Sequence, residues 1–231
     1  MGLLNHLIPP ICCLCGDRCS PEIHLSEALV CPTCRDALAP PEYGNRCGTC
    51  SIPIPQFIGH CERCRREEFS FDRAFAVHRY SGLPAQLIAA FKFGGHRSLA
   101  RPIGAAMASA VAGLAPPGSP LVPVPSQRKS VRRRGFAGAS LIAVEIARAS
   151  GRPVLSLLRA APGRSQKTLR YEERRSNALS TIEVAGTPSV PRELILVDDI
   201  FTTGITAETC ARRLLDAGAE HVFVLAFALD Y

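Results

Sequence analysis

The sequence predicts an α/β fold, in which a mostly parallel sheet is flanked by helices and preceded by a small cysteine-rich domain. From Phe69 onward, short β-branched runs alternate with helical stretches rich in alanine and leucine, a rhythm typical of a parallel sheet covered by helices. Before that point, the chain has ten of its eleven cysteines and no helical periodicity longer than about ten residues. We therefore expect a cysteine-rich domain at 1–68 and an α/β domain at 69–231.

The elements of the second domain are predicted in chain order. "DRAFAVHRY" forms a strand at 72–80, and helices at 83–93 and 97–113 follow it. After a loop rich in proline and glycine, "LVPVP" forms a strand at 121–125, which leads through a basic loop into a helix at 138–149. The remaining elements are a short strand at 153–158, a polar loop at 161–178, a strand at 193–198, a helix at 205–217 and a strand at 221–228.

The helix at 205–217 has the clearest sequence pattern. Ala207, Cys210 and Leu214 follow helical spacing, and Gly218 stands where a left-handed C-cap belongs. Cys210 is therefore predicted to be a small core residue and not a reactive thiol.

Composition limits the classes of protein to which the chain can belong. With 231 residues and 47% hydrophobic content, it is long enough for one substantial core and a small accessory domain. The formal net charge of +7 suits an anionic ligand such as a phosphate, a nucleotide or nucleic acid. The start, "MGLLNHLIPPICCLC", lacks the basic and apolar regions of a signal peptide, so we expect a cytoplasmic protein without membrane insertion.

Eight cysteines form four pairs, each with a gap of two residues. The pairs are Cys12 and Cys15, Cys31 and Cys34, Cys47 and Cys50, and Cys61 and Cys64. Such a gap lets a tight turn aim both thiolates at one tetrahedral ion, so the pattern predicts two structural zinc sites. Sequential grouping of the pairs is the simplest arrangement, and a crossed arrangement stays open. Disulfides and an iron–sulfur cluster are the weaker interpretations, and Cys13 or Cys19 could replace a neighbouring ligand.

The segment "LILVDDIFTTGIT", 194–206, combines acidic and hydroxyl side chains at the end of an apolar strand. Asp198 and Asp199 can accept hydrogen bonds from sugar hydroxyls or hold Mg²⁺. Thr202, Thr203, Gly204 and Thr206 follow at a helix N-terminus, where free N–H groups favour an anion. A mere helix cap would need neither a second carboxylate nor three hydroxyls. The segment therefore predicts a site for a phosphorylated sugar, and no Gly-rich nucleotide motif competes with it.

These residues carry a resemblance to a known family. "VDDIFTTGIT" resembles the phosphoribosyl diphosphate motif of type I phosphoribosyltransferases. Over nearly its full length the chain resembles the ComF family, competence-associated phosphoribosyltransferase-like proteins with a cysteine-rich zinc ribbon. "CCLCG" matches the ribbon, "VPVPSQRKSVRRRGF" the loop after the second core strand, and "SQKTLRYEERRSNA" the family's mobile segment. The resemblance implies a type I phosphoribosyltransferase fold for 69–231.

The resemblance also implies roles for individual residues. Asp198 and Asp199 would hold the ribose hydroxyls, directly or through Mg²⁺, and the threonine segment would hold the 5′-phosphate. The other implied ligand-binding residues are Pro125, Ser126, Arg132 and Arg134 in the diphosphate loop, Lys92 near the diphosphate, and Gln166, Arg174 and Asn177 in the mobile segment.

Two functions are compatible with this pattern. The first is a phosphoribosyltransferase that uses phosphoribosyl diphosphate and Mg²⁺, in DNA uptake or nucleotide metabolism. The alternative is a non-catalytic sensor of phosphoribosyl diphosphate, or a factor that binds single-stranded DNA within the competence machinery. Aromatic residues make up only 6% of the chain, which weakens the DNA interpretation. Ala137, Gly138 and Ser130 depart from residues common in the family, so the acceptor is not specified.

Overall fold

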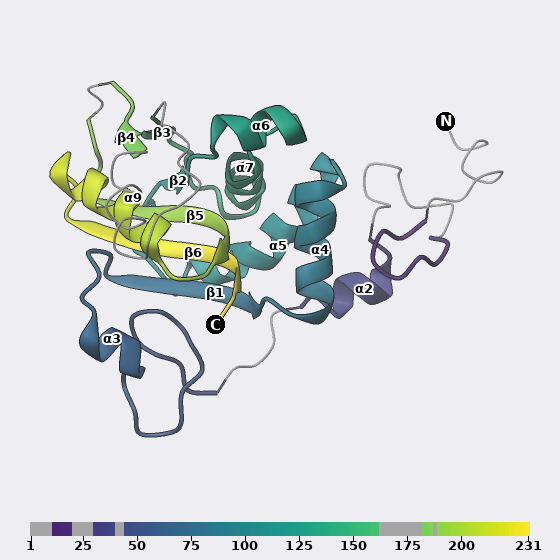
Figure 1. Ribbon diagram of the computed structural model, residues 1–231, viewed down its shortest axis with the longest axis horizontal. Coiled ribbons are helices and arrows are strands. Elements are labelled where there is room, and N and C mark those ends of the chain that lie inside the picture. Colours follow the sequence, from purple (N-terminus) through teal and green to yellow (C-terminus); the bar gives the residue numbers. More distant parts are fainter. Residues whose placement is uncertain (1–10, 20–29, 40–43, 162–181, 187–188) are drawn as a thin grey trace, which may run out of the picture.

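The fold is taken from a computed structural model, which describes residues 11–19, 30–39, 44–161, 182–186 and 189–231. Its centre is a parallel sheet with the strand order β1-β6-β5-β2 (Figure 1). The strands are β1 (Arg73–Arg79), β2 (Leu121–Pro123), β5 (Glu193–Phe201) and β6 (His221–Leu229). The expected α/β class and the mostly parallel sheet are confirmed.

Helices cover both faces of the sheet, and each face has its own core cluster. One face packs against α4 (Gly82–Phe93), α5 (Ala100–Val111) and α7 (Gly138–Ser150), and a short 3₁₀ turn, η1 (Arg97–Leu99), joins the first two of these helices. The other face packs against α9 (Ile205–Asp216), whose Cys210 is fully buried as predicted. Because both faces are covered, β5 contains the continuous apolar run "LILV", 194–197, instead of an alternating pattern.

The segment expected to be a basic loop is partly helical. Residues Arg128–Arg134 form α6, which ends at Gly135 in the left-handed conformation with a φ of +79°. The run "RKSVRRR" contains neither glycine nor proline, and arginine and lysine are good helix formers. The loop prediction was therefore wrong for these seven residues.

Two strand predictions also need correction. Within 153–158, only Val154 bridges to the sheet, and the next strand is β3 (Leu158–Ala160). β3 pairs in the antiparallel direction with β4 (Ile182–Val184), a strand that the sequence did not predict. The strand predicted at 193–198 extends to Phe201, because its pairing with β6 continues to Leu229. Both aspartates therefore lie in the strand.

The cysteine-rich region contacts the α/β body at two places (Figure 1). The first part carries α2 (Pro32–Asp36) beside α4, and its buried cysteines join the core cluster of that face. The second part carries α3 (Glu62–Arg66) and lies along the outer edge of β1, where the backbone N–H of Ala74 donates to the carbonyl of Thr49 at 2.7 Å. The second part thereby covers an edge of the sheet that would otherwise be open. The boundary at residue 68 stays a prediction.

Across the described ranges, the longest and most apolar helices still fall short of what a membrane crossing requires.

Candidate functional site

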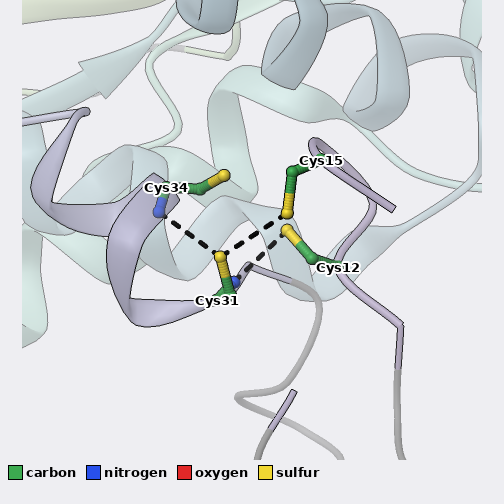
Figure 2. Close-up of side chains that lie close together, drawn as sticks. All are labelled: Cys12, Cys15, Cys31 and Cys34. Atoms are coloured by element: carbon green, nitrogen blue, oxygen red, sulfur yellow. Dashed lines mark hydrogen bonds between the residues drawn. The ribbon is translucent and has the colours of Figure 1, made fainter. Parts of the chain in front are cut away.

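The first cysteine cluster has the dimensions of a tetrahedral metal site (Figure 2). The sulfur atoms of Cys12, Cys15, Cys31 and Cys34 all lie within 4.8 Å of one another, and those of Cys15 and Cys31 are 3.7 Å apart. Four Zn–S bonds of about 2.3 Å in a tetrahedron place the sulfurs about 3.8 Å apart. The backbone N–H groups of Cys31 and Cys34 each donate to a cluster sulfur at 3.4 Å. The arrangement fits a zinc ion.

The second cluster has the same construction. The sulfur atoms of Cys47, Cys50, Cys61 and Cys64 lie within 4.8 Å of one another, and those of Cys50 and Cys61 are 3.6 Å apart. The pairs thus group in sequential order, and the crossed arrangement is not the one adopted. Neither Cys13 nor Cys19 belongs to a cluster.

One thiol in each cluster has a lowered pKa. Burial opposes the ionisation of Cys12, but hydrogen bonds from the backbone of Cys15, Cys31 and Leu14 outweigh burial and lower the pKa of Cys12 to about 6. The pKa of Cys47 is lowered to about 6 in the same way, because backbone hydrogen bonds outweigh the effect of its burial. Each cluster therefore holds one sulfur that is ready to bind a metal as thiolate.

The two clusters predict a metal content that a single substitution should change. Since each cluster is closed by four sulfurs, we expect the protein to hold two zinc ions and the Cys64→Ser variant to hold one. The measurement is elemental analysis of purified protein. Cys13→Ser is the matched control, because Cys13 lies beside the first cluster without belonging to it. Full zinc content in Cys64→Ser would contradict the assignment of the second cluster.

The two aspartates lie at the carboxyl end of β5, on different faces of the sheet. The Oδ1 atom of Asp199 is 2.7 Å from Nζ of Lys92, the next-to-last residue of α4. Asp198 lies toward the other face, where its charge helps to raise the pKa of the buried Cys210 thiol on α9. Lys92 therefore reaches this site through Asp199.

Asp198 and Asp199 are not electrostatically equivalent. Burial, followed by the adjacent charge of Asp199, raises the pKa of Asp198 to about 8. A hydrogen bond from the Asp199 N–H, 2.8 Å long, and the charge of Lys92 act in the opposite direction and are weaker. At pH 7 the free protein therefore keeps a proton on Asp198, and a bound cation would favour its release.

Residues 202–206, which we call the threonine turn, comprise the loop after β5 and the first two residues of α9. Thr202, Thr203 and Thr206 are exposed, whereas Gly204 is buried with a φ of +72°. A Cβ atom at Gly204 would lie 2.9 Å from the ring of Phe201 and 3.3 Å from that of Phe69. Because α9 begins at Ile205, its first N–H groups lack partners within the helix. The turn therefore has exposed hydroxyls, free donors and the positive end of a helix dipole in one place.

The remaining predicted ligand-binding residues lie in other segments of the chain. Pro125 and Ser126 follow β2, and the neighbouring Val124 N–H donates to the carbonyl of Val197 on β5 at 2.9 Å. Arg132 and Arg134 lie on α6, where Nε of Arg134 donates to the Ser130 carbonyl of the same helix at 3.4 Å. Gln166, Arg174 and Asn177 lie outside the described residues.

Comparison with known proteins identifies relatives along nearly the whole chain. No protein-family model matches it. It is 28% identical to Competence protein F of Haemophilus influenzae, over 91% of this chain and 95% of that protein. It is 26% identical to Competence protein ComFC of Bacillus subtilis, over 90% of both. It is also 26% identical to DNA utilization protein YhgH of Salmonella typhimurium, over 94% of this chain and 96% of that protein. Two of these three relatives are named competence proteins, which supports the resemblance of this chain to the ComF family.

A solved structure from Thermus thermophilus, that of TT1426, also matches this chain. The matched region covers 55% of this chain and 72% of the TT1426 chain, at 20% identity and a TM-score of 0.33. A similarity this low carries no argument about the fold.

The cysteine-rich part of the protein contacts the threonine turn, a contact that sequence reasoning missed. Arg63, on α3, donates a hydrogen bond through Nη2 to the carbonyl of Thr203. Glu208, in the first turn of α9, accepts from both the backbone N–H and the hydroxyl of Ser70, at 2.6 and 2.8 Å. The only sequence signal for Arg63 was its position between the two cysteines of the last pair.

Proposed function

We propose that this chain binds phosphoribosyl diphosphate with Mg²⁺ and transfers its phosphoribosyl group, in a role linked to DNA uptake. One observation carries the proposal. Asp198 and Asp199 lie near the end of β5, two residues before the threonine turn, at the carboxyl edge of a parallel sheet. Open α/β sheets bind ligands at this edge, and here carboxylates that suit a sugar or a cation adjoin a turn that suits a phosphate.

Each half of the proposed site would hold a different part of the ligand. The threonine turn would hold the 5′-phosphate, while Asp198 and Asp199 would hold the ribose hydroxyls and the cation. Pro125 and Ser126, which follow the neighbouring strand β2, would lie beside the diphosphate. The carboxylate oxygens of the two aspartates are the kind of ligand that Mg²⁺ prefers. Bound Mg²⁺ would supply positive charge for the leaving diphosphate.

In the proposed reaction, a nucleophilic acceptor forms a bond to C1 of the ribose while the bond from C1 to the diphosphate oxygen breaks. The electron pair leaves with the diphosphate, and the acceptor gives up its proton to solvent. Positive charge develops on the sugar, next to the carboxylates of Asp198 and Asp199, which would stabilise it. No nucleophilic side chain is needed.

The link to DNA uptake rests on the relatives, two of which are named competence proteins and one a DNA utilization protein. A specific observation favours single-stranded DNA binding as a second candidate function. The basic helix α6 lies beside exposed aromatic surface, because the guanidinium of Arg133 stands 5.4 Å over the ring of Phe93, which is 70% exposed. Arginine together with an aromatic ring is a usual platform for stacked bases.

Calorimetry tests the proposal. We expect phosphoribosyl diphosphate to bind with a dissociation constant of about 1–100 μM in the presence of Mg²⁺, and at least about tenfold more weakly when Mg²⁺ is left out of the buffer. A screen of acceptors for diphosphate release then tests transfer. If phosphoribosyl diphosphate does not bind under either condition, the proposed function is wrong. In that case, an oligonucleotide that binds with a steep salt dependence, lost in Phe93→Ala, would favour the second candidate.

A further inference from the structure

Arg63 connects the second cysteine cluster to the threonine turn. It lies between Cys61 and Cys64, both of which belong to that cluster, and α3 begins directly after Cys61. Besides its hydrogen bond to the Thr203 carbonyl, its guanidinium donates through Nε to Glu67 at 3.2 Å and stands 5.2 Å over the ring of Phe69. The side chain is only 28% exposed. Arg63 is therefore held on several sides.

The chain that leaves the cluster is attached to the same region of α9. Ser70 donates two hydrogen bonds to the buried carboxylate of Glu208, which also pairs with Arg212 at 2.6 Å. The ring of Phe69 stacks on that of Phe71 at 4.9 Å and also borders Gly204. Residues 61–71 and the start of α9 thus form one packed unit.

The contact with Thr203 sets the direction of a donor in the turn. The Thr203 carbonyl and the Gly204 N–H belong to one peptide unit, and in a planar trans peptide they point in opposite directions. A guanidinium that holds the carbonyl therefore aims the Gly204 N–H away from α3, and its charge strengthens the donor. Since glycine has wide conformational freedom, this peptide needs such an external contact to keep one orientation.

We propose that Arg63 is a positioning residue through which the second cysteine cluster sets the affinity of the threonine turn for phosphate. This inference rests on the proposed function. The helix α3 has five residues, too few to be stable alone, so a metal held by Cys61 and Cys64 would fix its position. Loss of that metal would release Arg63 and, with it, the peptide between Thr203 and Gly204.

The test compares Arg63→Ala with Arg66→Ala in the full-length protein. Arg66 lies on the same helix, and among the contacts described it pairs only with Glu62 of that helix. Arg66→Ala therefore removes the same charge as Arg63→Ala but removes no contact with the α/β domain. We expect ribose 5-phosphate to bind Arg63→Ala about tenfold more weakly than wild type, the size expected for a hydrogen bond to a charged group. Binding of inorganic diphosphate should stay within about twofold, since its site is on the other side of the ligand.

Zinc content and thermal midpoint are measured on each variant, because a purely structural defect would change them along with both affinities. Arg63→Lys, which keeps the positive charge and a donor group, should recover part of the loss. Cys64→Ser should reproduce the loss for ribose 5-phosphate. If wild type binds neither ribose 5-phosphate nor phosphoribosyl diphosphate, the proposed function itself fails. If wild type binds and Arg63→Ala binds equally well, only the positioning role is refuted. Equal weakening by Arg66→Ala would also refute it, because net charge and not position would then explain the effect.

Discussion

Asp198→Asn is expected to weaken the binding of phosphoribosyl diphosphate with Mg²⁺ by about a hundredfold or more and, at the same time, to raise the thermal midpoint of the ligand-free protein. The carboxylate is the group that would face the sugar and the cation, so its loss removes the charge that binding needs. In the free protein that same charge is unfavourable, because Asp198 is poorly solvated and adjoins Asp199. Binding and stability should therefore change in opposite directions.

The pH dependence of stability predicts how the change in thermal midpoint of Asp198→Asn should vary with pH. The pKa of Asp198 rises from an ordinary 3.8 to about 8 in the folded protein, so between these values the unfolded chain has lost a proton that the folded chain keeps. The contribution of Asp198 to the free energy of unfolding is thus greatest below about pH 4 and declines as the pH rises to about 8. Asparagine has no such titration. The gain in midpoint for Asp198→Asn should be small at about pH 5 and larger at about pH 8.

The proton on Asp198 should also be detectable when ligand binds. Because the site needs the ionised carboxylate, wild type should release a proton on binding the magnesium complex near pH 7, and Asp198→Asn should not. Calorimetry in two buffers with different ionisation enthalpies measures this release. Asp216→Asn, an exposed carboxylate on α9, is the control and should alter neither affinity nor midpoint. A midpoint that falls in Asp198→Asn, or proton release that persists there, would contradict the role assigned to Asp198.

The sequence was most informative where a structure is specified by local pattern. The apolar run 194–197, the helical spacing after Ile205 and the glycine at 204 together predict the strand, the turn and the helix without any distant contact. The cysteine pairs are local in the same sense, since each two-residue gap already determines how its two sulfurs converge.

What the sequence could not predict depends on contacts between distant residues. Arg63 and Thr203 are 140 positions apart, and no periodicity relates them. The pairing of Lys92 with Asp199 likewise follows from the packing of α4 on the sheet. The error at α6 has another origin, because a run whose one apolar residue is Val131 has no apolar stripe by which a helix could be recognised.

Gly204→Ala should have the largest effect of any small substitution at the turn. A non-glycine residue at the φ of +72° costs about 1–2 kcal/mol by itself. The added Cβ would also lie 2.9 Å from the ring of Phe201, which is buried and packs edge-on against Phe71, so the ring cannot easily move away. Such crowding adds about 1–3 kcal/mol to the loss of stability. The turn would shift to relieve the contact, and phosphate binding should be lost.

Gly151→Ala separates the two causes. Gly151 has nearly the same φ, +71°, but a Cβ there would meet nothing within 4 Å. Gly151 follows the last residue of α7 and precedes Val154, which pairs with the first residue of β2. Gly151 therefore lies near the amino ends of the strands, whereas the aspartates lie near their carboxyl ends. Denaturant unfolding should show a loss of about 1–2 kcal/mol for Gly151→Ala, with ligand affinity unchanged. For Gly204→Ala, the loss should be greater, and ribose 5-phosphate binding should be undetectable. Equal losses in the two variants, with binding retained in both, would mean that the close approach of Phe201 and Phe69 to the turn is not what shapes the phosphate site.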